Sequence, residues 1–235
     1  MTGILVQLVV SWLIAWFVEK QHLNVLGLSP RKQRLADFFL FLMLSACCSA
    51  SGFLLRIWWG REQWELNPLF NYNLLLEGIW WNIKSVLFEE LIFRGVLLYI
   101  LIKRLGVWKG ILISAVAFGV YHWFSYGIIG DIPKMALYFF ITGIMGIIYA
   151  YAYAKTFSLY IPVAIHFGWN FIQSFVFSNG PIGKGILVLS KNQVPVTVSW
   201  AAYITILALP VLGIWLSAFF LLRRKKQAPV PGLTV

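Results

Sequence analysis

Two adjacent carboxylates and an arginine, Glu89, Glu90 and Arg94, stand inside an apolar stretch that has the character of a membrane helix. One charged side chain at the centre of such a helix costs roughly 2.5 to 3.5 kcal/mol on insertion scales, so three together need a functional or structural reason. A carboxylate can act as a base toward a bound water molecule. Glu89 is therefore a candidate catalytic base.

Two more polar pairs occur in similarly apolar segments. His122 follows Phe118 by four residues, and Asn170 follows His166 by four residues. Because an α-helix turns through 3.6 residues, both members of an i, i+4 pair lie on one helix face and can point into one interior site. The leading hypothesis is therefore one catalytic centre assembled from three helices.

These side chains match the needs of peptide-bond hydrolysis. That reaction requires a base to activate water, donors to hold the developing oxyanion, and an acid for the leaving amine. Glu89 is the predicted base, and His122 is the candidate that shares the water or relays its proton. His166 and Asn170, one helical turn apart, are the candidate donors to the oxyanion.

Three further residues have supporting roles in this hypothesis. Glu90 and Arg94 have the i, i+4 spacing of a helix ion pair, and we expect Arg94 to orient and neutralise the carboxylates rather than to contact substrate. Phe118 is expected to pack beside His122. Taken singly, the motifs have a structural interpretation as ion pair, packing residues and interhelical hydrogen bonds. The three together favour an active site over a purely structural network.

The elements that must position these residues have the composition of membrane helices. Of the 235 residues, 60% are hydrophobic and only 11% are charged, which favours an integral membrane protein over a soluble globule. Hydropathy and helix breakers predict an all-α, polytopic transmembrane helix bundle with an intramembrane polar cavity. The predicted spans are seven: residues 3–19, 36–58, 79–102, 109–126, 135–154, 157–177 and 200–222.

The sequence also leaves an alternative span count and predicts the limits of the domain. Residues 69–78 are either a surface helix or the start of a longer third span, so that eight spans is the alternative count. We predict a single integral membrane domain over residues 1–226 and a short disordered cytoplasmic tail over residues 227–235.

Basic residues alternate between the loops in the way that the positive-inside rule expects. Twelve follow the first, third, fifth and seventh spans, and five lie in the intervening loops. The twelve are Lys20, Arg31, Lys32, Arg34, Lys103, Arg104, Lys109, Lys155, Arg223, Arg224, Lys225 and Lys226, and the five are Arg56, Arg61, Lys134, Lys184 and Lys191. This distribution predicts a multi-pass cell-membrane protein with a cytoplasmic C-terminus. The net charge of +11 then indicates contact with anionic lipid rather than with nucleic acid.

The depth of each motif can be predicted from the nearest basic helix end, at 1.5 Å of rise per residue. On this basis Glu89 lies about 21 Å from Lys103, and His122 lies about 20 Å from Lys109. His166 lies about 17 Å from Lys155. The motifs are therefore expected at a common level in the bilayer.

The motifs at Glu89, Glu90 and Arg94, at Phe118 and His122, and at His166 and Asn170 come in a fixed order between residues 85 and 174. In type, spacing and order they resemble those of the CAAX-protease and bacteriocin-processing family of intramembrane proteases, which is related to the type II CAAX prenyl endopeptidases. The resemblance implies a multi-spanning helical endopeptidase in which the first motif glutamate activates water, while His166 and Asn170 bind the oxyanion. It leaves the substrate open, because the family also includes bacteriocin-immunity and regulatory members.

A metal ion is the main alternative within this mechanism. Glu89, His122 and His166 have the side chains of a three-ligand zinc site with an open water position. The chain has no His-Glu-x-x-His helix, and Asn170 is a poor zinc ligand but a good oxyanion donor. We therefore predict glutamate-activated water with no cofactor, and keep zinc as the alternative.

Two other classes of function use similar residues. A non-proteolytic binding or regulatory protein, such as an immunity protein or a signalling scaffold, would keep the fold and its polar cavity. A proton-coupled transporter also places Glu, His and Arg in membranes, but this chain shows no sign of the paired halves common in transporters. The predicted partners are the lipid bilayer and a membrane-associated peptide or protein substrate.

Overall fold

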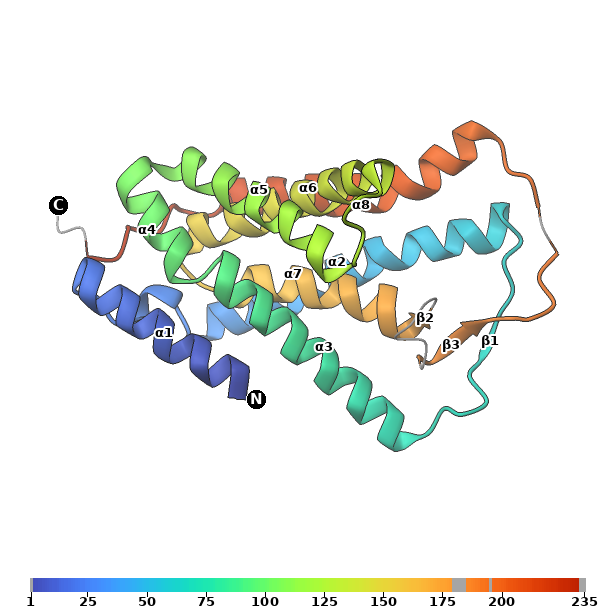
Figure 1. The fold of residues 1–235 in the computed structure, drawn as a ribbon, viewed down its shortest axis with the longest axis horizontal. Coiled ribbons are helices and arrows are strands. Elements are labelled where there is room, and N and C mark those ends of the chain that lie inside the picture. Colours follow the sequence, from blue (N-terminus) through green and yellow to red (C-terminus); the bar gives the residue numbers. More distant parts are fainter. Residues whose placement is uncertain (1, 179–184, 195, 233–235) are drawn as a thin grey trace. The chain divides into compact units, whose positions relative to one another are not determined.

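The computed structural model of the protein describes residues 2–178, 185–194 and 196–232. Within these ranges the chain forms eight α-helices, joined by short turns and three short strands (Figure 1). The helices are α1 (Thr2–Glu19), α2 (Lys32–Trp59), α3 (Tyr72–Phe93), α4 (Val96–Leu105), α5 (Val107–Ser125), α6 (Ile132–Thr156), α7 (Tyr160–Phe171) and α8 (Trp200–Arg224). The loop cation Lys184 and residues 233–235 of the predicted tail lie outside the described residues.

Five of the described helices, α1, α2, α5, α6 and α8, are long and apolar enough to cross a membrane. The prediction of a polytopic helical membrane bundle is confirmed. Two helices that carry motif residues do not meet the same criteria, for different reasons. α3 contains the charged residues Glu77, Lys84, Glu89 and Glu90, and α7 is only 12 residues long.

The predicted third span, residues 79–102, is wrong as a single helix. α3 ends at Phe93 and α4 begins at Val96, with Gly95 at the N-terminus of α4. A Cβ atom on Gly95 would lie 2.0 Å from the main-chain oxygen of Leu91, so this turn requires glycine. α3 begins at Tyr72, which makes residues 72–78 part of the longer third helix rather than a separate surface helix.

This break also changes the predicted depths. Glu89 and Lys103 lie on different helices, α3 and α4, and Lys155 lies on α6 while His166 lies on α7. A rise of 1.5 Å per residue applies only along one continuous helix. The depths predicted for Glu89 and His166 are therefore not valid, whereas His122 and Lys109 do share α5.

The chain divides into two compact units. Unit 1 contains residues Met1–Phe38, Leu87–Val163 and Ala218–Val235, and unit 2 contains Phe39–Val86 and Ala164–Ser217. Four helices, α2, α3, α7 and α8, contribute residues to both units.

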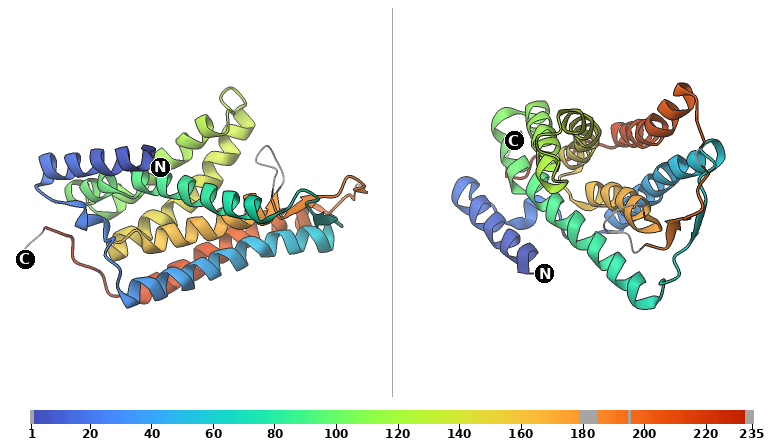
Figure 2. Two further views of the ribbon diagram at one scale, coloured as in Figure 1. Left: turned by 90° about the horizontal axis from the view of Figure 1, so that it is seen from below. Right: turned by 45° about the vertical axis from the view of Figure 1, so that its right-hand side comes forward.

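In unit 1, α4, α5 and α6 pack side by side (Figures 1 and 2). Their interface is apolar and fully buried at residues such as Leu98, Ile111 and Tyr153. α6 begins at an N-cap, Asp131, whose side chain accepts a hydrogen bond from Lys134 N at 3.2 Å. The ammonium group of Lys134, which also bonds the carboxylate, holds the pKa of Asp131 below its usual value.

Residues 227–231, which belong to the predicted disordered tail, make specific contacts in unit 1. Gln227 Nε2 donates to Ala154 O at 2.7 Å, and Ala228 N donates to Lys155 O at 3.1 Å. The hydroxyl of Tyr99 on α4 donates to Pro231 O at 2.7 Å. This segment therefore runs along the C-terminal end of α6.

Unit 2 contains a small sheet that the all-α prediction did not include. Its strands are β1 (Trp64–Leu66), β2 (Phe177–Ser178) and β3 (Leu187–Leu189), in the order β1-β3-β2 (Figure 1). β1 is antiparallel to β3, with Glu65 opposite Val188, and β2 is parallel to β3. Strands of two or three residues are too short for a period-2 pattern to reveal them.

Candidate active site

The first motif is buried, with Glu89 and Glu90 on the last two turns of α3 and Arg94 directly after its end. Glu89 is 9% exposed, while Glu90 and Arg94 are both 0% exposed. Arg94 Nη1 lies 3.1 Å from Glu90 Oε1, so the ion pair predicted from the i, i+4 spacing forms inside the protein. A buried cation with a carboxylate partner is the arrangement that makes two charges tolerable in an apolar environment.

The guanidinium group of Arg94 is held between aromatic rings. It lies 4.1 Å from the ring centroid of Phe118, 4.9 Å from that of Tyr149 and 5.8 Å from that of Phe93. Its Nη2 donates to the main-chain oxygen of Gly146 at 3.3 Å. Cation–π attraction is strongest where water is excluded, so this enclosure fixes the position of Arg94 from three sides.

We expect Glu90→Gln to destabilise the protein by about 3 to 5 kcal/mol, because it leaves the buried Arg94 cation without its counter-charge. Thermal unfolding of the purified protein in detergent measures this loss. Glu62→Gln is the matched control, since its pair with Arg56 is short at 2.9 Å but partly exposed, and exposed pairs contribute about 0–1 kcal/mol. Equal losses in the two variants would contradict the role given to Glu90.

The second motif, on α5, continues from Arg94. Phe118 is 2% exposed and His122 is 6% exposed, and their rings lie 4.5 Å apart at 77°. His122 Nδ1 is 2.7 Å from the main-chain oxygen of Phe118. A carbonyl oxygen only accepts, so Nδ1 carries the proton and, in the neutral ring, Nε2 is the nitrogen that can take up another. Phe118 thus touches both Arg94 and His122.

Gly146 on α6 sets the space available to this cluster. A Cβ atom there would lie 3.2 Å from Arg94 Nη2, from the Cα of Ala115 and from Phe118 Cδ1. We expect Gly146→Ala to cost about 1 to 3 kcal/mol through overpacking and to lower any activity that depends on His122. Thermal unfolding of the purified variant measures the loss of stability, and its turnover measures the loss of activity.

Gly143→Ala is the control for that experiment. Gly143 lies one turn earlier on α6, and the nearest atom to an added Cβ is Ala115 O at 3.8 Å. Alanine there is expected to be neutral or slightly stabilising, because alanine favours helix over glycine by about 1 kcal/mol. Two variants with the same behaviour would show that Gly146 has no special packing role.

The third motif lies on α7 in unit 2. His166 is 3% exposed, and its Nε2 lies 3.1 Å from Asn170 Nδ2. With the Asn170 amide as the donor, His166 Nε2 is the acceptor, and the proton of the neutral ring is on Nδ1. The predicted pairing of these two residues on one helix face is therefore present.

Two serines that the prediction missed hold α7 against α2. Ser45 Oγ donates to Ile165 O at 2.6 Å, and Ser49 Oγ donates to Trp169 O at 3.3 Å. A Cβ atom on Gly168 would lie 2.5 Å from Leu42 O, so the two helices approach closely. The i, i+4 spacing of the serines in an apolar helix was the signal that would have revealed them.

The structure thus groups the predicted residues into two clusters. One cluster lies in unit 1 and is a continuous set of contacts from Glu90 through Arg94 and Phe118 to His122. Glu89, which precedes Glu90 in the sequence, is also buried. In unit 2, His166 pairs with Asn170. Among the described residues, no group of three or more His, Cys, Asp or Glu side chains has the arrangement of a metal site.

Residues 71–172 match the family model described as Type II CAAX prenyl endopeptidase Rce1-like. The chain carries an Rce1-like segment. This segment begins one residue before α3 and ends one residue after α7, so it contains all three motifs, and the suspected family is confirmed. No curated protein and no solved structure matches the chain.

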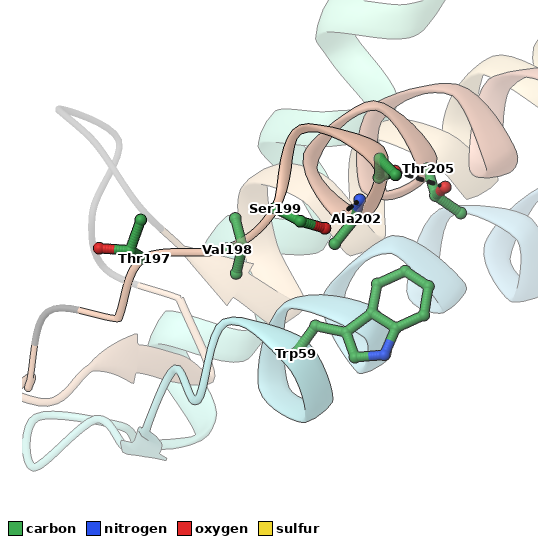
Figure 3. Close-up of a pocket in the computed structure, with 7 residues that line it drawn as sticks. Trp59, Thr197, Val198, Ser199, Ala202 and Thr205 are labelled. Atoms are coloured by element: carbon green, nitrogen blue, oxygen red, sulfur yellow. Dashed lines mark hydrogen bonds between the residues drawn. The ribbon is translucent and has the colours of Figure 1, made fainter.

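The Rce1-like segment accounts for the motif helices but not for everything that positions them. Ser45 and Ser49 on α2 lie outside it, although they bond directly to α7 within it. A pocket of about 460 Å³ also lies outside it, lined by Trp59 on α2 and by residues around the start of α8 (Figure 3). None of the seven lining residues is Glu, Asp, His, Lys, Tyr or Cys, so this pocket has no side chain suited to act as a general base.

Proposed function

We propose that this protein is an intramembrane endopeptidase that hydrolyses a peptide bond in a membrane-associated protein or peptide. The observation that carries the proposal is the buried cluster of Glu90, Arg94, Phe118 and His122 next to Glu89, inside a segment of a membrane-protease family. Charged groups buried inside a membrane helix bundle are expensive, and they mark functional sites by default.

In this proposal Glu89 is the base that activates the attacking water. Glu90 is the carboxylate that lies 3.1 Å from Arg94, and we assign it the structural role. His122 presents Nε2 as the nitrogen that exchanges a proton, because Nδ1 is fixed by Phe118 O. It therefore shares the water with Glu89 or passes its proton toward the leaving amine.

His166 and Asn170 are proposed to stabilise the oxyanion of the tetrahedral intermediate. The amide of Asn170 carries two N–H donors, and one is accounted for by His166 Nε2. The second donor suits an oxyanion. The support for joining this pair to the Glu89 cluster is the order and spacing of the three motifs within the family segment.

We propose that the reaction uses no metal ion. If Nε2 of His166 were to bind zinc, the Asn170 amide that donates to it would have to move away, because both use the same lone pair. The proposed setting is the cell membrane, with a cytoplasmic C-terminus as the basic loops indicate. The proposed partners are the lipid bilayer and a membrane-associated substrate.

Cleavage by the purified protein in lipid vesicles tests this function. Two probes separate the substrate classes: a farnesylated peptide with a C-terminal Cys-aliphatic-aliphatic-X sequence, and a membrane-spanning peptide without a prenyl group. Mass spectrometry of the products identifies the bond that is cut. Cleavage of at least one probe is expected, and a folded protein that binds the probes without cutting either would instead indicate a non-proteolytic binding protein.

A further inference from the structure

A chain of hydrogen bonds in unit 2 connects α3 to Asn170. Ser174 lies on the π-helical turn η2 (Ile172–Val176), and its Oγ is 3.2 Å from Asn82 Oδ1 on α3. The same hydroxyl is 2.5 Å from the main-chain oxygen of Asn170, so its single proton is shared between two acceptor oxygens. Asn82 is 1% exposed, and its Nδ2 donates to Gly78 O at 2.9 Å. The amide of Asn82 is therefore fixed by its own helix with the carbonyl oxygen facing Ser174.

The turn that carries Ser174 is π-helical. In this turn the main-chain bonds run to the fifth residue, as from Phe177 N to Ile172 O, rather than to the fourth. The bond from the Ser174 hydroxyl to the carbonyl four residues earlier is one that serines also make in α-helices, as Ser217 does to Gly213 on α8. π-helical turns occur frequently at functional sites.

A second contact fixes the same two elements one turn earlier on α3. A Cβ atom on Gly78 would lie 2.0 Å from Cε2 of Phe175, so the Phe175 ring rests directly on the α3 backbone. α3 and η2 thus meet at two adjacent points, Gly78 with Phe175 and Asn82 with Ser174. Two contacts one turn apart set both the distance and the register of η2 along α3.

We propose that Asn82 and Ser174 are positioning residues for the oxyanion side chains. By holding η2 against α3 they fix the carbonyl of Asn170, and with it the direction of the Asn170 amide and its contact with His166. Asn82 lies seven residues, or two turns, before Glu89 on α3, so the helix of the proposed base also holds the turn that follows Asn170. This inference rests on the proposed function.

The contact between Asn82 and Ser174 is tested by measuring the cleavage kinetics of three variants: Asn82→Ala, Ser174→Ala and the double variant. The substrate is the peptide probe that the wild-type protein cleaves. Each single change is expected to lower kcat about tenfold or more with little change in KM, because a displacement of ~1 Å can cost 10²-fold in rate. The double variant is expected to be no slower than the slower single variant, since both changes break one connection.

Ser217→Ala is the matched control. Ser217 lies on α8 and bonds the main-chain oxygen of Gly213 four residues earlier, as Ser174 bonds that of Asn170, but its contact with another helix is with Cys48 on α2 rather than with α3. This variant is expected to keep normal turnover. Ser174→Thr retains the hydroxyl and is expected to restore most of the rate lost in Ser174→Ala.

A spectroscopic readout separates this inference from the proposed function. The chain has three histidines, so ¹⁵N-histidine labelling in detergent micelles gives few signals, and His→Gln variants assign them. Ser174→Ala and Asn82→Ala are expected to shift the Nε2 signal of His166 while those of His22 and His122 stay in place. If the wild-type protein cleaves no probe, the proposed function fails and this signal still tests the link.

Two results would overturn the inference. The first is an unchanged His166 signal in both folded variants. The second is a pair of rate losses that add fully in the double variant, which would mean that Asn82 and Ser174 act independently.

Discussion

Glu89→Gln is expected to abolish peptide cleavage while leaving the protein folded in the membrane. Glutamine keeps the shape of the side chain but cannot take a proton from water, and loss of a general base costs about 10²–10⁴ in rate. The measurement is turnover of the purified variant in lipid vesicles, together with its thermal unfolding. Because glutamine keeps the size and shape of the side chain and Glu90 keeps its ion pair with Arg94, we expect the unfolding temperature to change little.

Glu77→Gln is the matched control for this substitution. Glu77 lies on the same helix as Glu89, and the change in charge is the same, but its side chain is exposed. It should retain full activity. Near-normal turnover of Glu89→Gln would remove Glu89 from the role of base, and an unfolded variant would place Glu89 in the same structural class as Glu90.

Asn170→Ala is expected to lower turnover by roughly 10²–10³, the usual loss of one oxyanion donor. Asn170→Asp is expected to be as slow, because it keeps the shape but places acceptor oxygens where the amide nitrogen now faces His166 Nε2 at 3.1 Å. Substrate affinity should change less than turnover, since the donor acts on the transition state. Asn73→Ala, at the exposed start of α3, is the control.

The same experiment separates the metal-free mechanism from a zinc mechanism. Without a metal, activity survives prolonged chelation. A zinc mechanism with Glu89, His122 and His166 as ligands predicts chelator-reversible loss of activity, with Asn170 peripheral. Stoichiometric zinc in active protein by elemental analysis, combined with a nearly unaffected Asn170→Ala variant, would replace the metal-free assignment.

Contacts between residues one helical turn apart were predicted well from the sequence. The pairs Glu90 with Arg94 and His166 with Asn170 form because residues four apart on a helix face each other, and this holds wherever the helix lies. Burial of the motifs followed from their apolar neighbours. The family suspicion also rested on these local patterns, and it is confirmed over residues 71–172.

Features that depend on distant parts of the chain were not predictable in this way. The helix break at Gly95 occupies only a few residues. A hydropathy window as long as a whole span averages over these residues and therefore does not detect the break. The bonds from Ser45 and Ser49 to α7 join residues 120 positions apart. The enclosure of Arg94 by Tyr149 and Gly146 comes from α6, which carries no motif residue.

A single-turnover reaction in ¹⁸O-labelled water tests the central claim most directly, because it follows the oxygen that Glu89 is proposed to activate. The protein is used in excess over the probe peptide, and the products and the Glu89-containing fragment of the protein are weighed by mass spectrometry. Water activated by Glu89 places one ¹⁸O in the new carboxyl terminus of the peptide and none in the protein. Label in Glu89 would contradict the account, since it would show a glutamyl anhydride formed by direct attack of the carboxylate and then opened by water.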